Sequence, residues 1–119
     1  MRLLVVGICG ASDLNIARYM PDGVSLIITS GCRDAARVAE AYADDNGISK
    51  LILRPQHGIY GESAAAKCNE AMLNIADEII VFWDGKTKGV SYIMSRAEER
   101  NIVCNVAVIT DAADEYNKF

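Results

Sequence analysis

The sequence predicts an α/β fold in which helices cover both faces of a five-stranded parallel sheet, forming a three-layer sandwich. Five short runs of consecutive apolar residues recur along the chain, and such runs are typical of strands buried on both faces. Segments with helical character separate the runs, and parallel strands need crossover connections of this kind. A length of 119 residues suits one domain, so we expect a single domain over 1–119.

The five apolar runs are the expected strands. The third of them ends at Pro55, which has no N–H group to donate to a neighbouring strand. The runs are LLVVGI at 3–8, VSLIIT at 24–29, KLILRP at 50–55, DEIIVFW at 77–83 and IVCNVAVI at 102–109.

Four segments between these runs are expected to be helical. Gly47 follows the second segment and suits its C-terminal cap. The stretch QHGIYGES at 56–63 is expected to be a loop, and the polar tail from about residue 110 is expected to be loose. The helical segments are LNIARYM at 14–20, AARVAEAYADDNG at 35–47, SAAAKCNEAMLNIA at 63–76 and VSYIMSRAEERN at 90–101.

The regular alternation of strand and helix predicts a Rossmann-like sandwich with strand order 3-2-1-4-5. In open parallel sheets, ligands bind beyond the carboxyl ends of the strands, where the strand order reverses. Strands one and four are neighbours at that point. We therefore expect three glycine-bearing connections to converge there, GICGAS at 7–12, TSGCRD at 29–34 and WDGKTKG at 83–89.

The first two connections carry residues that suit an anionic ligand. Glycine lets a backbone approach a ligand closely, and hydroxyl and N–H groups at a helix start donate to phosphate. The alternatives are a simple tight turn in the first connection, and an arginine paired with Asp34 on the surface in the second. The residues concerned are Gly7, Gly10 and Ser12 in the first connection and Ser30, Gly31 and Arg33 in the second.

The third connection, DGKTKG at 84–89, places two lysines just before a helix. A positive charge at a helix N-terminus opposes the helix dipole, and a bound anion would relieve this conflict. A solvated turn is the alternative. The residues expected to contact the ligand are Asp84, Gly85, Thr87, Lys88 and Gly89, and Asn69 on the third helix is added if that end of the helix faces the cleft.

Candidates for catalysis are few. Asp34, Glu62 and Asp84 are carboxylates near the expected cleft, where an acid or base could act on a leaving group. A cysteine nucleophile would need a base, and the single histidine, His57, lies after the third strand.

The charge, the apolar runs and the cysteine spacing disfavour nucleic-acid binding, a membrane location and a metal site. A net charge of −4 and a pI of about 4.9 disfavour general nucleic-acid binding, which depends on neutralising phosphates. The N-terminus does not read as a signal peptide and no apolar run approaches the ~20 residues of a membrane span, so we expect a cytoplasmic protein. The four cysteines form no Cys-x-x-Cys pair and His57 is the only histidine, so a metal is not expected. No cofactor is expected either.

Three stretches of the chain resemble the SLOG superfamily of Rossmann-like domains (the SMF/DprA-LOG group), above all its small YspA/YpsA-like members. They are TSGCRDAARVAEAYADDNGI, KCNEAML and ADEIIVFWDGKTKGVSYIMSRAEERNI, and the resemblance runs from about Val5 to Val108. It implies a nucleotide or nucleotide-derived ligand at the connections after strands one, two and four. The family's Arg-Asn pair falls on Cys68 and Asn69, so only the asparagine is kept.

Three functions follow as hypotheses. The first is a binding module for a nucleotide-type ligand, with a sensing role. The second is a phosphoribohydrolase of the LOG type, which cleaves the N-glycosidic bond of a nucleotide; its motif carries a glutamate where this chain has Ile93. The third is a partner-binding domain with a vestigial cleft. The stripe Ile93, Met94 and Ala97 is a candidate for a homo-oligomer contact and equally for core packing.

Overall fold

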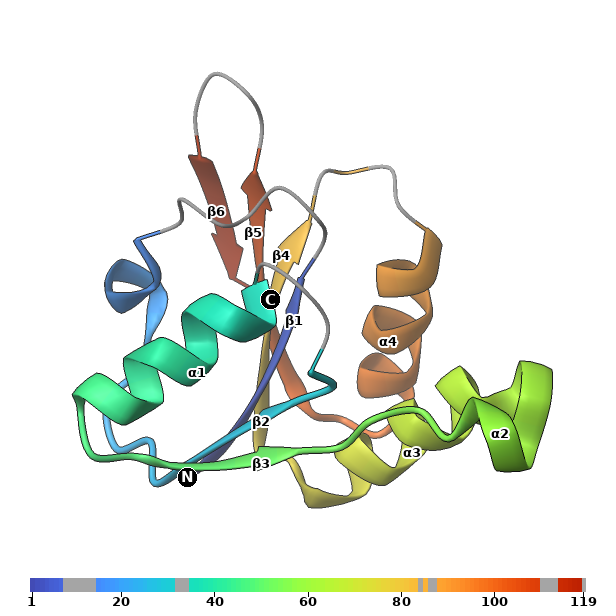
Figure 1. Cartoon of the computed structure of the whole chain (residues 1–119). Coiled ribbons are helices and arrows are strands. Elements are labelled where there is room, and N and C mark those ends of the chain that lie inside the picture. The colour runs from blue at the N-terminus through green and yellow to red at the C-terminus, as the bar shows by residue number, and fades with distance from the viewer. Residues whose placement is uncertain (8–14, 32–34, 84, 86–87, 110–113, 119) are drawn as a thin grey trace.

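The computed structural model describes residues 1–7, 15–31, 35–83, 85, 88–109 and 114–118, and its strands form one six-stranded sheet in the order β3-β2-β1-β4-β5-β6 (Figure 1). The first five strands are parallel to one another. This arrangement confirms the predicted α/β class and the predicted order of the five parallel strands. The strands are β1 (Arg2–Gly7), β2 (Leu26–Thr29), β3 (Ser49–Ile52), β4 (Glu78–Trp83), β5 (Val103–Ile109) and β6 (Asp114–Lys118).

Strand β6 is the main difference from the expected architecture. It pairs antiparallel with β5, with Asn105 opposite Lys118 at one end and Ile109 opposite Asp114 at the other. The sequence predicted a loose tail here because DEYNK contains no apolar run. A strand at the edge of a sheet is held by main-chain hydrogen bonds on one side, and charged residues are favoured there because they prevent further pairing.

The helical segments agree with the prediction for α1, α3 and α4 and differ elsewhere. The first expected helix is a single 3-10 turn in which Ile16 and Tyr19 are both buried, as suits side chains that are three residues apart and share one side of such a turn. The expected loop at 56–63 contains two short helical turns. The elements are η1 (Ile16–Tyr19), α1 (Ala35–Asp45), α2 (His57–Tyr60), η2 (Gly61–Ser63), α3 (Ala64–Ile75) and α4 (Lys88–Glu99).

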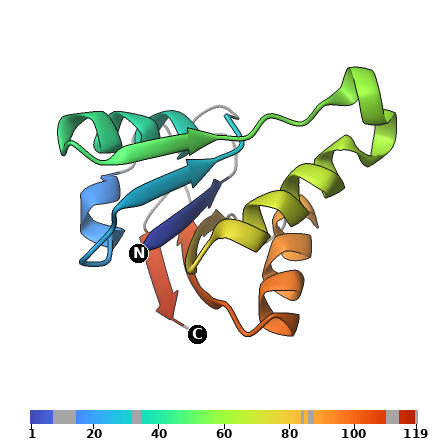
Figure 2. The same ribbon diagram turned by 90° about the horizontal axis from the view of Figure 1, so that it is seen from below.

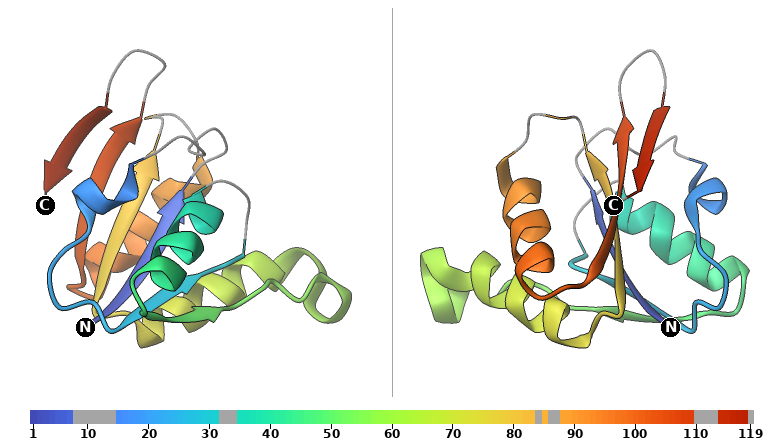
Figure 3. Two further views of the ribbon diagram at one scale, coloured as in Figure 1. Left: turned by 60° about the vertical axis from the view of Figure 1, so that its left-hand side comes forward. Right: turned by 180° about the vertical axis from the view of Figure 1, so that it is seen from behind.

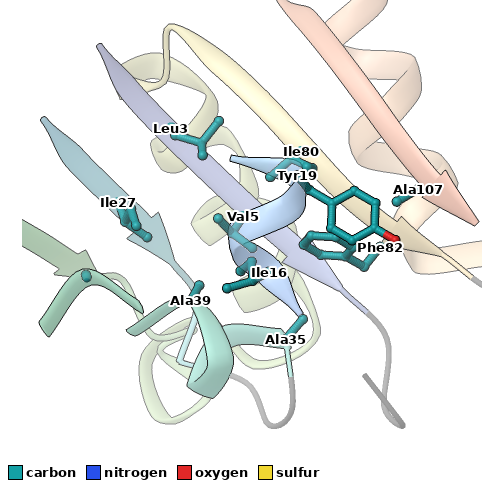
Figure 4. Close-up of a cluster of buried hydrophobic side chains, with 11 residues drawn as sticks. Leu3, Val5, Ile16, Tyr19, Ile27, Ala35, Ala39, Ile80, Phe82 and Ala107 are labelled. Atoms are coloured by element: carbon teal, nitrogen blue, oxygen red, sulfur yellow. The ribbon is translucent and has the colours of Figure 1, made fainter. Parts of the chain in front are cut away.

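One face of the sheet is covered by η1 and α1, which lie on the side opposite to α4 (Figure 3). Helix α1 presents Ala35, Ala39 and Ala43 to the sheet, and all three are fully buried. Small side chains repeated every four residues allow a helix to approach the strands closely. The ring of Tyr19 packs edge-on against Phe82, with 5.3 Å between the ring centroids (Figure 4).

The other face is covered by α3 and α4. Ile93 and Ala97 are buried in this layer, and Met94 is partly buried against the same cluster. The stripe on α4 therefore packs within the chain, which is the second of the two interpretations that the sequence allowed. The cluster contains Leu4, Ile28, Cys68, Met72, Leu73, Ile79, Val81, Val90, Ile93, Ala97 and Val106.

The segment formed by α2 and η2 projects away from the sheet beyond the end of β3 (Figure 2). Neither element contains a buried residue, and Ile59 is 73% exposed. The ring of Tyr60 lies under the Lys67 ammonium group at 5.0 Å. This segment extends from the domain and contributes nothing to its core.

Candidate ligand-binding site

The strands β1, β2, β3 and β4 are parallel, so their carboxyl ends lie at one edge of the sheet. We call this edge the carboxyl edge. Gly7 at the end of β1 is opposite Phe82 of β4, and Thr29 at the end of β2 is opposite Ile52 of β3. This register places the strand ends from which the connections after β1, β2 and β4 begin at the same edge of the sheet. Much of these connections falls outside the described residues, including the predicted site residues Gly10, Ser12, Arg33, Asp34, Asp84 and Thr87.

Gly7 is a glycine because helix α1 packs directly against it. A Cβ atom on Gly7 would lie 2.1 Å from the Cβ of Ala35 and 3.5 Å from the Cβ of Phe82. Contacts under 3 Å cannot be accommodated in a packed core, so only glycine fits here. The absence of a side chain lets α1 begin directly against the end of β1, which gives a structural reason for this predicted site glycine.

The turn after β2 is held by a hydroxyl group that the sequence analysis did not single out. The Thr29 side chain is fully buried, and its hydroxyl donates to Oε2 of Glu40 at 3.2 Å. The N–H group of Gly31 donates to Oγ1 of Thr29 at 3.3 Å, and Gly31 has a φ of +73°, which favours glycine. The predicted ligand residues Ser30 and Gly31 therefore lie on a turn whose conformation Thr29 sets.

The side chain of Arg54 lies against this turn. Its Nη1 donates to the carbonyl oxygen of Gly31 at 3.4 Å, and its Cζ and Nη1 atoms are each 3.0 Å from where a Cβ of Gly31 would be. Arg54 follows β3, the neighbour of β2. The sequence analysis did not select Arg54 as a site residue because it placed Arg54 within the third strand. Its position at the end of an apolar run, just before Pro55, could have indicated that it lies at the carboxyl edge.

The third connection is described in part. Gly85 is exposed with a φ of +82°, and no atom of the described residues, its chain neighbours aside, lies within 4 Å of where its Cβ would be. Helix α4 begins at Lys88, followed by Gly89, and its first turn contains no acidic residue. Of Lys88 and Gly89 only the backbone is described. The helix thus starts with a lysine at the end where its dipole disfavours positive charge.

Two further predicted site residues lie on other elements than these turns. Glu62 is exposed in η2, on the segment that projects away from the sheet (Figure 2). Asn69 lies in the middle of α3 and is half-buried. Among the described residues, the side chain of Asn69 has no hydrogen-bond partner. The structure therefore does not bring Glu62 together with the ends of β1 and β4.

Arg96 of α4 and Arg100, which follows α4, form ion pairs with Glu70 of α3. The Nε of Arg96 lies 2.7 Å from Oε1 of Glu70, and the Nη2 of Arg100 lies 2.5 Å from Oε2. The hydrogen bond from Arg96 lowers the pKa of Glu70. This cluster joins α3 to α4 and has a structural role.

A surface hollow of about 620 Å³ lies between α4 and β5, away from the carboxyl edge. Its lining includes Met94, Val103 and Cys104. Burial raises the pKa of the Cys104 thiol to about 11, so the thiolate that would act as a nucleophile is disfavoured. The hollow therefore offers no activated cysteine.

Comparison with known protein families, with curated proteins and with solved structures gives no match for this chain. In the described part of the chain, no group of three or more His, Cys, Asp or Glu side chains is placed to hold a metal ion. None of the described helices has the length and apolar character needed to cross a membrane.

Proposed function

We propose that this protein binds a nucleotide or a nucleotide-derived phosphorylated ligand at the carboxyl edge of its sheet. The observation that carries the proposal is the adjacency of β1 and β4 at the point where the strand order reverses, which is where open α/β sheets bind ligands. If the protein binds this ligand without converting it, we propose that its role is to sense the ligand.

In this proposal the phosphate lies near the start of α4. Backbone N–H groups at a helix start are free to donate to an anion, and Lys88 at the first helical position supplies positive charge. Among the described residues, chain neighbours aside, no atom comes within 4 Å of the Cβ position of Gly85, just before the helix. Ser12, Thr87 and Arg33 complete the proposed contacts. The resemblance of this region to the SLOG superfamily supports the same assignment.

The packing of Ile93 argues against hydrolysis of the LOG type. The resemblance places the glutamate of LOG-type hydrolases at Ile93, and this side chain is 3% exposed within the cluster between the sheet and α4. A group in that position does not reach a ligand at the edge of the sheet. Binding therefore remains our first proposal and hydrolysis the alternative that the experiment must test.

We also propose a cytoplasmic location. Cys68 and Cys104 are free thiols, and the four cysteines have no spacing typical of a disulfide framework or a zinc site. Reduced thiols are typical of the cytoplasm.

The test combines a binding assay with a search for product. Purified protein is mixed with the 5′-mono- and diphosphates of adenosine, guanosine, cytidine and uridine, and its melting temperature is recorded. A ligand at ~100 times its Kd stabilises the folded state by ~2.7 kcal/mol, which is easily detected. Chromatography of the same mixtures reveals any free base.

Each outcome decides between the hypotheses. A rise in melting temperature without free base supports the binding module, and release of base establishes a phosphoribohydrolase. If no nucleotide changes the melting temperature, the binding proposal is rejected in favour of a partner-binding domain. Lys88→Ala is expected to weaken a bound nucleotide about tenfold, whereas the control Lys67→Ala, which removes the same charge from α3, is expected to leave binding unchanged.

A further inference from the structure

Arg54 differs from the ion-paired arginines of the described structure. Arg2 pairs with Asp77, and Arg96 and Arg100 pair with Glu70. The described part of the chain contains no carboxylate within ion-pair distance of Arg54, whose recorded contact is with the main chain of Gly31. Within the described residues, its guanidinium is therefore a positive charge at the carboxyl edge with a main-chain partner and no acidic one.

The contact with Gly31 positions this charge. The guanidinium occupies the space that a side chain at position 31 would fill, with Cζ and Nη1 3.0 Å from the Cβ position. Gly31 is in turn held by its hydrogen bond to the buried Thr29. A guanidinium has five N–H donors, and within the described residues the carbonyl oxygen of Gly31 engages only one of its nitrogens.

The strand order places Arg54 beside the proposed ligand site. β3 is hydrogen-bonded to β2, and β2 to β1. Neighbouring strands are about 4.8 Å apart, so the segments after β2 and β3 are adjacent at the same edge. A guanidinium with free donors binds phosphate or carboxylate through two parallel, charge-assisted hydrogen bonds.

We propose that Arg54 contacts an anionic group of the bound ligand, and that this contact lets the site select a phosphorylated nucleotide over its neutral nucleoside. The inference rests on the proposed function, because it assigns a residue to the same site. The role of Arg54 can be tested separately from the proposed function, since the protein could bind a nucleotide through the start of α4 alone.

The test measures the Kd of the wild-type protein for two pairs of probes, adenosine with adenosine 5′-monophosphate and guanosine with guanosine 5′-monophosphate. The same measurements are made on Arg54→Gln and on the control Lys50→Gln. Lys50 lies on β3, and its exposed ion pair with Asp44 is expected to contribute little to stability. Melting temperatures without ligand verify that both variants are folded.

We expect the wild-type protein to bind the nucleotide more tightly than the nucleoside. Arg54→Gln should reduce this preference about tenfold by weakening the nucleotide alone, and Lys50→Gln should preserve it. A salt titration provides a second readout, because losing a charge contact makes nucleotide binding less sensitive to ionic strength.

Two results would overturn the assignment of Arg54 and leave nucleotide binding intact. One is an unchanged preference in Arg54→Gln, and the other is an equal loss for nucleotide and nucleoside, which would indicate a structural role. If the wild-type protein binds neither nucleotide, the proposed function is rejected and the assignment of Arg54 is rejected with it.

Discussion

Gly7 and Ala35 are in such close contact that a Cβ on Gly7 would lie 2.1 Å from the Cβ of Ala35. Gly7 ends β1 and Ala35 begins α1, so this contact joins the central strand to the helix that covers it. The end of β1 and the start of α1 therefore lie side by side at the edge of the sheet where we propose that the ligand binds.

Gly7→Ala is expected to destabilise the protein by about 3 kcal/mol, the upper part of the range for overpacking a core, because α1 must move away from β1. Urea denaturation measures the change in the free energy of unfolding. Gly58→Ala is the matched control, since in the described part of the chain no atom outside its own helical turn lies within 4 Å of the Cβ position there. Equal stability of the wild type and Gly7→Ala would show that α1 is not packed against β1 in this way.

Stability is expected to fall at low pH through Asp77. The guanidinium and the N–H group of Arg2 hold the pKa of Asp77 to about 2, below its ordinary value of 3.8. A carboxylate whose pKa is lower in the folded state than in the unfolded state stabilises the fold when the pH is above the unfolded-state pKa. This stabilisation is lost as the pH falls through the folded-state pKa. The loss through Asp77 should therefore occur between about pH 4 and pH 2.

Asp77→Asn tests this prediction, because it removes the titrating group and keeps the shape of the side chain. The variant should be less stable than the wild type at neutral pH, and the difference should shrink as pH falls from 4 to 2. Thermal melts across this range provide the measurement. A difference in melting temperature that stays constant with pH would exclude the Arg2–Asp77 pair as its source.

Ile93→Glu is expected to destabilise the fold without creating a hydrolase. The side chain of Ile93 is 3% exposed among apolar residues, and an unpaired carboxylate buried there costs several kcal/mol or is protonated. Ile93→Leu is the control, with an expected loss of less than about 1.5 kcal/mol. Release of free base from a nucleotide by Ile93→Glu, but not by the wild type, would show that position 93 does face a ligand.

The arrangement of the five parallel strands could be predicted because it depends on local patterns. The run from Glu78 to Trp83 reads as a buried strand from its own residues, and the helical spacing of Cys68 and Met72 identifies the buried face of α3. Apolar runs of this length must be covered on both faces, and the preferred handedness of crossovers then leaves few topologies.

Elements without an apolar signal could not be predicted in the same way. Strand β6 is polar and forms only because β5 offers it an edge with unpaired main-chain groups. The turn η1 is too short for a helical period to be seen in its sequence, and the burial of Ile16 and Tyr19 against the sheet defines it.

For the candidate site, the chain order alone determined which strand ends share an edge: glycine-bearing segments follow β1, β2 and β4, and parallel strands bring their carboxyl ends to one edge. Only the tertiary structure decided how these glycines are used. Gly7 makes room for Ala35, and Gly31 makes room for Arg54, which is 23 residues further along the chain. Such contacts depend on how neighbouring strands align in space, and no local pattern of residues records that alignment.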